Sequence, residues 1–151
     1  MPRFHALLAA AALPLLAACG KPPAGAAIDP QDARKVARGQ AVYAAQCAAC
    51  HGASLGGQPD WRRRKPDGRM PAPPHDDSGH TWHHPDEVLF GITKEGLVPG
   101  KYGPPGYVSD MPAFRGLLSD EDIAAVLSYI QSRWSPEVRR ARGEMLSNRG
   151  R

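Results

Sequence analysis

Cys47-Ala48-Ala49-Cys50-His51 is the stretch of sequence on which the fold of this 151-residue chain depends. It holds two of the three cysteines, separated by two alanines, and a histidine follows the second cysteine at once. Three cysteines are too few for a framework of disulfide bonds. Two thiols beside an imidazole instead indicate a site for a metal ion, a redox dithiol or a covalently attached group.

The spacing of this motif matches the geometry of haem attachment. Two thiols three positions apart can reach the two vinyl groups on one haem edge, and the next histidine is then held beneath the iron as its proximal ligand. A zinc site would need a second pair of ligands, and no further cysteine is at hand for it. A thioredoxin-like dithiol would need a βαβ setting, whereas this pair ends an alanine-rich helical segment. We therefore expect one haem c, bound through Cys47 and Cys50, with His51 as an iron ligand.

The segment that follows the motif is rich in glycine and proline: 21 of the 32 such residues in the chain lie between Gly52 and Gly116. Proline lacks a hydrogen-bond donor and glycine weakens regular elements, so a continuous sheet or a long bundle is excluded there. Irregular loops wrapped around a bound group are expected instead. The length suits one domain, and a net charge of +4 does not by itself indicate a nucleic-acid partner.

Three helices can be placed, which predicts an all-α fold. The first runs from Asp29 or Asp32 to Cys47, with Asp32 as a plausible cap and apolar residues at helical spacing. The second begins at His84-Pro85-Asp86-Glu87 and stops at Gly96. The third has Ser119 as its cap, an apolar stripe that ends at Trp134, and Pro136 after it. We expect the basic tail, residues 136–151, to be a disordered, solvated end.

The first eighteen residues have the pattern of an export signal: a short basic start, then an apolar run from Ala6 to Ala18. The run ends Leu16-Ala17-Ala18-Cys19-Gly20, which resembles the lipobox of bacterial lipoproteins. The resemblance implies removal of residues 1–18 and a lipid on Cys19. Residues 19–30 contain three prolines and several alanines and are expected to form a flexible tether. The folded domain is then expected over residues 31–135.

Four segments give the chain a resemblance to class I c-type cytochromes, the small single-haem proteins of bacterial electron transport, over about Ala37 to Trp134. They are Gly39-Gln40-Ala41-Val42-Tyr43, Cys47 to Gly52, Met111-Pro112-Ala113-Phe114, and the last helix with Tyr129-Ile130. The resemblance implies a small fold of three or more helices with long loops around the haem. It also implies that the first and last helices cross closely, with Gly39 and Tyr43 meeting Val126, Tyr129 and Ile130.

The same resemblance selects the second iron ligand. Met70 and Met111 both precede a proline, which favours an extended loop. In the family the distal methionine lies on a loop just before the last helix, so Met111 is expected to bind the iron and Met70 is the alternative. The family also uses a proline carbonyl to accept the N–H of the proximal histidine, and Pro59 is the best match. Trp61 can donate its indole N–H to a haem propionate or pack on the haem edge.

Two further groups of residues leave alternatives open. His75, His80, His83 and His84 allow a bis-histidine haem or a copper site, or they cap the second helix, lie exposed or bond a propionate. The basic patch of Arg62, Arg63, Arg64, Lys65 and Arg69 can neutralise a propionate, steer an acidic partner or lie near anionic lipid. Tyr102 and Tyr107 are expected to pack over the distal face.

The expected function is that of a monomeric carrier of single electrons, not an enzyme, held by lipid on the periplasmic side of a bacterial membrane. Its partners are redox proteins that dock transiently, and nucleic acid is not among them. One alternative is a haem protein with an open or displaceable sixth ligand, which acts as an enzyme or a sensor. The other is a copper-handling protein that uses the His75–His84 cluster.

Overall fold

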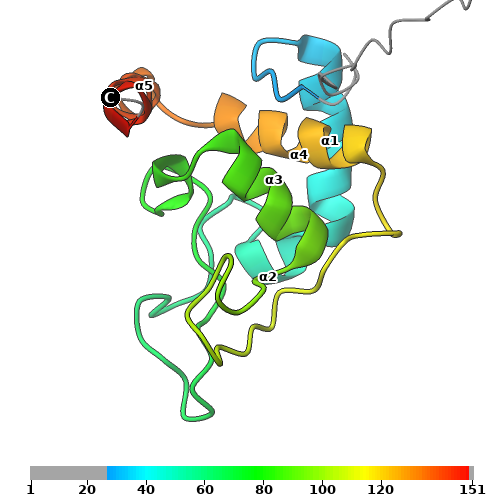
Figure 1. The fold of residues 1–151 in the computed structure, drawn as a ribbon. Coiled ribbons are helices and arrows are strands. Elements are labelled where there is room, and N and C mark those ends of the chain that lie inside the picture. The colour runs from blue at the N-terminus through cyan, green and yellow to red at the C-terminus, as the bar shows by residue number, and fades with distance from the viewer. Residues whose placement is uncertain (1–26, 150–151) are drawn as a thin grey trace, which may run out of the picture.

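Two helices, α1 (Ala33–Gln46) and α4 (Asp120–Ser132), cross at close range, and α4 is the buried one of the pair (Figure 1). Gly39 lies at the crossing, where a Cβ atom would be 1.9 Å from the Ala125 carbonyl oxygen and 2.9 Å from the Tyr129 Cβ. Only glycine permits this approach. The crossing that the family resemblance implies is therefore confirmed.

The computed structural model describes residues 27–149 and contains five α-helices and one short 3₁₀ helix in that range. The shorter elements are α2 (Ala48–His51), η1 (Thr81–His83), α3 (Asp86–Glu95) and α5 (Pro136–Arg149). Within the same range the extended pairings are isolated bridges, at Pro99–Gly103 and Arg115–Leu118, and no strand forms. The predicted all-α fold is confirmed.

The three helices expected from the sequence are α1, α3 and α4, and their predicted caps are in place. The Asp32 carboxylate accepts the N–H groups of Arg34 at 3.0 Å and Lys35 at 3.2 Å. The Ser119 hydroxyl accepts the N–H of Asp122 at 3.1 Å. Gly96 ends α3 with a φ of +78°, a left-handed conformation that favours glycine. Local capping chemistry thus determines where these helices begin and end.

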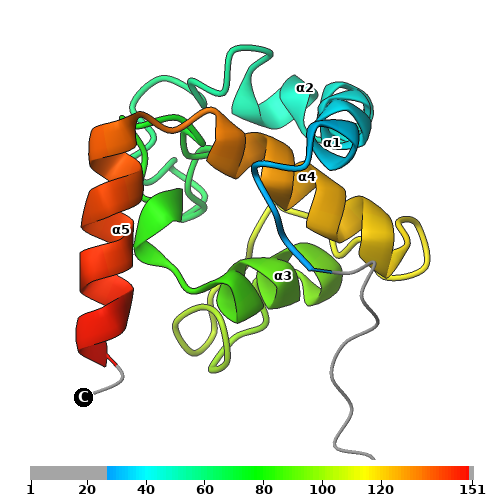
Figure 2. The same ribbon diagram turned by 90° about the horizontal axis from the view of Figure 1, so that it is seen from above.

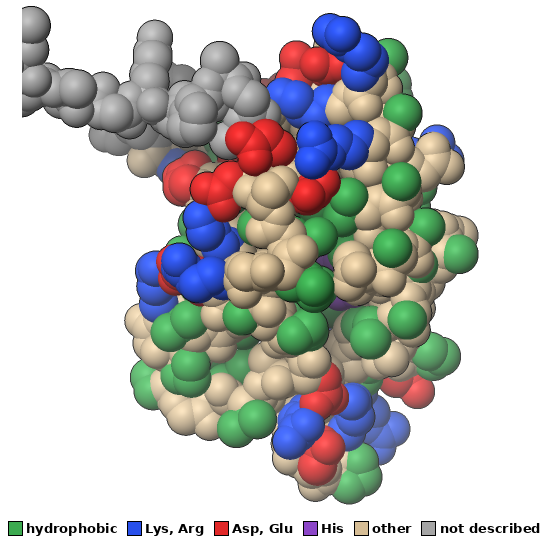
Figure 3. Space-filling model, turned by 90° about the vertical axis from the view of Figure 1, so that its right-hand side faces the viewer, with side chains coloured by type: hydrophobic (Ala, Val, Ile, Leu, Met, Phe, Trp, Pro, Cys, Tyr) green, Lys and Arg blue, Asp and Glu red, His purple; other side chains and the backbone are tan. Residues whose placement is uncertain are grey.

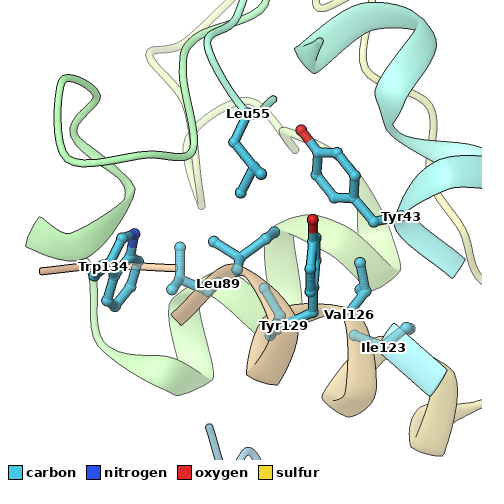
Figure 4. Close-up of a cluster of buried hydrophobic side chains, with 9 residues drawn as sticks. Tyr43, Leu55, Leu89, Ile123, Val126, Tyr129 and Trp134 are labelled. Carbon is cyan, nitrogen blue, oxygen red and sulfur yellow. The ribbon is translucent and has the colours of Figure 1, made fainter. Parts of the chain in front are cut away.

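The hydrophobic core lies between α1, α3, α4 and the turn after the motif (Figure 4). Ile123 and Val126 are fully buried, and Tyr43 packs against Tyr129 with their ring centroids 5.4 Å apart. The Tyr43 hydroxyl donates to the Gly52 carbonyl at 3.0 Å. The core therefore also holds the end of the cysteine motif in place.

The folded part begins before residue 31, where we expected the tether to end. Ile28 packs against the core, and the Asp29 N–H donates to the Ser128 hydroxyl of α4 at 2.9 Å. These contacts fix the last residues of the predicted tether. Cys19 and the predicted signal, residues 1–18, lie outside the described residues.

The expectation of a disordered tail is wrong for residues 136–149, which form α5 at one side of the molecule (Figure 2). Ser135 caps this helix by accepting the Val138 N–H at 3.2 Å. Arg142 is buried, and its guanidinium donates to the carbonyl oxygens of Trp82 and His84 and to the Asp86 carboxylate. Polar contacts to η1 and the start of α3 therefore hold α5, which explains why a search for an apolar stripe misses it.

None of the helices among residues 27–149 combines the length and the apolar character that crossing a bilayer requires.

We predict that Gly39→Ala strongly destabilises the protein, because its methyl group would collide with the backbone of α4 rather than with a movable side chain. Overpacking typically costs about 1–3 kcal/mol, and a backbone collision belongs at the upper end. Thermal unfolding of the haem-loaded protein measures the effect. Gly143→Ala is the matched control, since Gly143 lies in α5 with no atom within 4 Å of the added Cβ. Equal melting temperatures for the two variants would contradict the prediction.

Candidate haem site

The cysteine motif forms the single turn of α2, directly after α1. Cys47 is the cap residue between α1 and α2, and its carbonyl accepts the backbone N–H of His51 at 2.9 Å. His51 is buried, Cys47 is half-buried and Cys50 is exposed, and both thiols are free. Burial raises the pKa of the Cys47 thiol to about 11.

A hydrogen bond to the backbone fixes the imidazole of His51. Its Nδ1–H donates to the Pro73 carbonyl at 2.8 Å, which leaves the lone pair on Nε2. Burial lowers the pKa of His51, and the bond to Pro73 raises it in part. A neutral imidazole that donates one N–H to a fixed acceptor is the form that binds a metal through its other nitrogen. Together with the two thiols, this donor set fits an iron porphyrin held by thioethers.

Pro59 does not accept this N–H, so that expectation is wrong. Gly57 lies against the backbone of residues 72–74, where a Cβ on Gly57 would be 2.5 Å from the Pro74 nitrogen. Gln58 and Ala72 are joined by two hydrogen bonds, at 2.9 and 3.0 Å. Residues 58–72 therefore form a loop whose two ends meet. The residue after this loop, Pro73, lies beside His51, whereas Pro59 lies within the loop.

The 58–72 loop is also joined to the segment that carries Met111. Lys65 lies 2.7 Å from the Asp110 carboxylate, and Arg69 pairs with the same carboxylate. The Met70 N–H donates to the Tyr107 hydroxyl at 3.2 Å. Lys65 and Arg69 lower the pKa of Asp110 by hydrogen bonding and charge. Met70 thus belongs to the loop that binds Asp110, the residue directly before Met111.

Met111 lines an apolar groove of about 370 Å³ together with Leu97, Val98, Tyr107 and Val108. The other end of its segment is fixed to α3, because the Phe114 N–H donates to the Thr93 carbonyl at 3.1 Å. Figure 3 shows a face on which hydrophobic side chains surround a hollow with a histidine at its floor, above a cluster of charged side chains (Figure 3). Tyr107 lines the Met111 groove, whereas the hydroxyl of Tyr102 packs against Gly91 of α3.

Of the four clustered histidines, His80 and His84 lie edge to face with their ring centroids 5.5 Å apart, whereas His75 and His83 have other ring partners. The ring of His75 stacks on His51, the ring of His80 stacks on Trp61, and His83 is exposed beside Trp82. Burial lowers the pKa of His75, His80 and His84. Among residues 27–149 no group of three or more His, Cys, Asp or Glu side chains is placed to hold a metal ion. The geometry therefore gives the copper alternative no support.

Trp61 and the basic patch lie in the 58–72 loop. The Trp61 ring is stacked on His80 with centroids 5.3 Å apart, and the Arg62 guanidinium lies 4.3 Å from its centroid. Its bond to a haem propionate stays a prediction. Of the five basic residues, Lys65 and Arg69 are paired with Asp110, and the side chains of Arg62, Arg63 and Arg64 are exposed.

Sequence reasoning missed two residues of this site, Pro73 and Asp110, and did not foresee that the ring of His75 stacks on His51. The run Pro71-Ala72-Pro73-Pro74 carries a signal for a rigid segment, but only the closed 58–72 loop brings Pro73 to His51. Asp110 directly precedes Met111, and its partners, Lys65 and Arg69, belong to a loop about forty residues earlier. No local sequence pattern indicates such a distant pairing.

Comparison with known proteins gives one match. The family model described as "Cytochrome c" matches residues 36–134, a range that starts in α1 and ends at Trp134, just after α4. It covers most of α1, all of α4, the cysteine motif and Met111. No curated protein and no solved structure matches the chain.

We predict that Asp110→Asn loosens the segment that carries Met111, because it removes the carboxylate shared by Lys65 and Arg69. Amide hydrogen exchange of residues 107–113 should become faster in the haem-loaded protein. High salt should produce the same change in the unsubstituted protein, since these pairs are exposed and screened by ions. Glu144→Gln, which breaks the exposed Arg140–Glu144 pair of α5, is the control and should leave this segment unchanged.

Proposed function

This chain belongs to the cytochrome c family, and on that basis we propose that it is a lipid-anchored carrier of single electrons on the periplasmic side of a bacterial membrane. Haem c is the cofactor, held covalently through Cys47 and Cys50. When bound, it supplies a reversible Fe(II)/Fe(III) couple. The roles below are those of the chain's own residues.

The observation that carries the proposal is the state of His51. Its Nδ1–H is held by the Pro73 carbonyl, which fixes the ring and leaves the Nε2 lone pair for a metal, as the proposed ligand role requires. The acceptor is a backbone carbonyl, so no side-chain rotation can remove it. The backbone around Pro73 is itself fixed, because it packs against Gly57 and is hydrogen-bonded to Gln58. A carrier requires such rigidity, since its ligands must remain in place through both oxidation states.

Met111 is the residue we propose as the sixth ligand. Its thioether is neutral, and such a ligand stabilises Fe(II) relative to Fe(III) and raises the reduction potential. Its segment is attached to α3 through Phe114 and to the 58–72 loop through Asp110. These attachments oppose loss of the ligand and favour electron transfer over catalysis at an open iron site.

Exposed apolar side chains near Met111 support transient docking of a redox partner. Val98 and Val108 line the same groove, and their exposed fractions are 36% and 59%. The exposed side chains of Arg62, Arg63 and Arg64 lie in the 58–72 loop, which contacts this segment. An apolar contact with basic neighbours suits a partner of acidic surface, because opposite charges speed the encounter.

The membrane attachment rests on the sequence alone. Leu16-Ala17-Ala18-Cys19 supplies the lipobox-like segment, and the described contacts of the chain with its core begin at Ile28. The residues between Cys19 and Ile28 are the proposed link from a lipid at the membrane surface to the haem domain. They contain Pro22 and Pro23, which favour an extended chain.

We predict that the ferric protein shows a sulfur-to-iron charge-transfer band and that its ferrous form does not bind carbon monoxide. Met111→Ala should abolish the band, open the iron to carbon monoxide and lower the reduction potential, because a neutral thioether ligand is lost. Met70→Ala is the matched control and should leave all three measurements unchanged. A band that survives in Met111→Ala but disappears in Met70→Ala would assign the ligand to Met70.

An unsubstituted protein without the band would contradict the carrier proposal. Its sixth site would then be open or occupied by a histidine, and carbon monoxide binding distinguishes these two states. An open site favours an enzyme or a sensor of small gases.

We predict that Cys19→Ala moves the protein from the membrane fraction to the soluble periplasmic fraction, because the lipid would be absent. Fractionation of cells followed by haem staining measures this. Haem content should remain unchanged, since Cys19 is not one of the two attachment thiols. A protein that stays with the membrane after this substitution is not anchored by lipid on Cys19.

A further inference from the structure

The ring of His75 lies flat against the ring of His51. The two centroids are 4.0 Å apart and the planes differ by 25°, which is a stacked arrangement. The proposed function assigns no role to His75. His51 is thus contacted in two directions, at its Nδ1 edge by the Pro73 carbonyl and on its face by His75.

His75 is itself held at three atoms. Its backbone N–H donates to the Leu55 carbonyl at 2.7 Å, and its backbone carbonyl accepts the Trp134 indole N–H at 2.9 Å. Its Nδ1 lies 2.8 Å from the hydroxyl oxygen of Thr81. These contacts fix the position and the plane of the His75 ring.

Thr81 also determines the direction of that last bond. Its hydroxyl donates to the Pro74 carbonyl at 3.3 Å, so its oxygen accepts the hydrogen bond that the Nδ1–H of His75 donates. Pro74 is fully buried, and a Cβ on Gly79 would be 2.1 Å from its carbonyl oxygen. The segment from Pro73 to Thr81 is therefore one tightly packed turn that presents both a hydrogen-bond acceptor and a ring to His51.

We propose that His75 is a positioning residue that fixes the plane of the His51 imidazole. A single hydrogen bond at Nδ1 still allows the ring to turn about the line that joins it to its acceptor. A second ring stacked on its face blocks that rotation. Because the orientation of an imidazole that binds iron determines its overlap with the iron d orbitals, His75 would influence the electronic state of a bound haem without touching the iron. The inference rests on the proposed ligation by His51.

Three substitutions separate stacking from simple packing. His75→Leu removes the ring and retains much of the volume, whereas His75→Phe retains a ring and loses the bond to Thr81. Thr81→Val keeps the histidine at position 75 but removes the hydroxyl that holds its ring. It therefore tests the role of the ring's position in case the changes at residue 75 impair folding. His83→Leu is the matched control, because His83 is an exposed histidine of the same segment that does not contact His51.

The readouts are the g values of the ferric haem protein in electron paramagnetic resonance, which report the orientation of axial ligand planes, and the reduction potential. We expect His75→Leu to shift both, His75→Phe to return the g values toward those of the unsubstituted protein, and Thr81→Val to give an intermediate shift. His83→Leu should change neither.

Two results would overturn the role of His75: unchanged g values in a folded, haem-loaded His75→Leu protein, or an equal shift in His83→Leu. If His75→Leu does not fold, unchanged g values in Thr81→Val would also overturn the role of His75. Failure of the proposed ligation looks different, because the unsubstituted ferric protein would then lack the low-spin signal of two axial ligands.

Discussion

The hydrogen bond from His51 to the Pro73 carbonyl is the constraint on which the rest of the structure depends. It requires α2 and a segment more than twenty residues later to meet at one point. The Tyr43 hydroxyl holds the end of α2 from one side by its bond to Gly52, and the close approach of Gly57 to residues 72–74 holds the other segment. Since Tyr43 belongs to the packed α1–α4 crossing, the helical core and the ligand geometry are stabilised by the same contacts.

A second set of contacts extends this support to the far end of the chain. Arg142 of α5 donates to the carbonyl oxygens of Trp82 and His84, which flank the end of η1. The first residue of η1 is Thr81, whose hydroxyl holds His75 against His51. Helix α5, which the sequence did not reveal, is thus connected through η1 and His75 to the ring face of His51, the proposed iron ligand. A buried arginine with three acceptors suits this task, because leaving it unpaired would be costly.

Sequence reasoning succeeds where the structure depends on local patterns and fails where it depends on distant contacts. Asp32, Ser119 and Gly96 mark the ends of helices through capping chemistry within a few residues, so α1, α3 and α4 could be predicted. From the sequence, Pro136 suits a stop after α4 as well as the first position of a new helix, and the cap at Ser135 makes it the latter. Pro73 and His75 reach His51 only because residues 58–72 close into a loop, and no local pattern specifies that closure.

The 58–72 loop also bears on the choice between a carrier and an enzyme. Its ends join the segment that holds His51, and its middle holds Asp110, the neighbour of Met111. Each exposed ion pair is weak by itself, but the backbone bond from Met70 to Tyr107 acts on the same segment. If Met111 is the ligand as proposed, its displacement would disturb contacts that reach the segment holding His51. A small structural change between oxidation states lowers the barrier to electron transfer, whereas catalysis at the iron requires a ligand that leaves readily. The connection between the two segments that carry the proposed ligands favours the carrier.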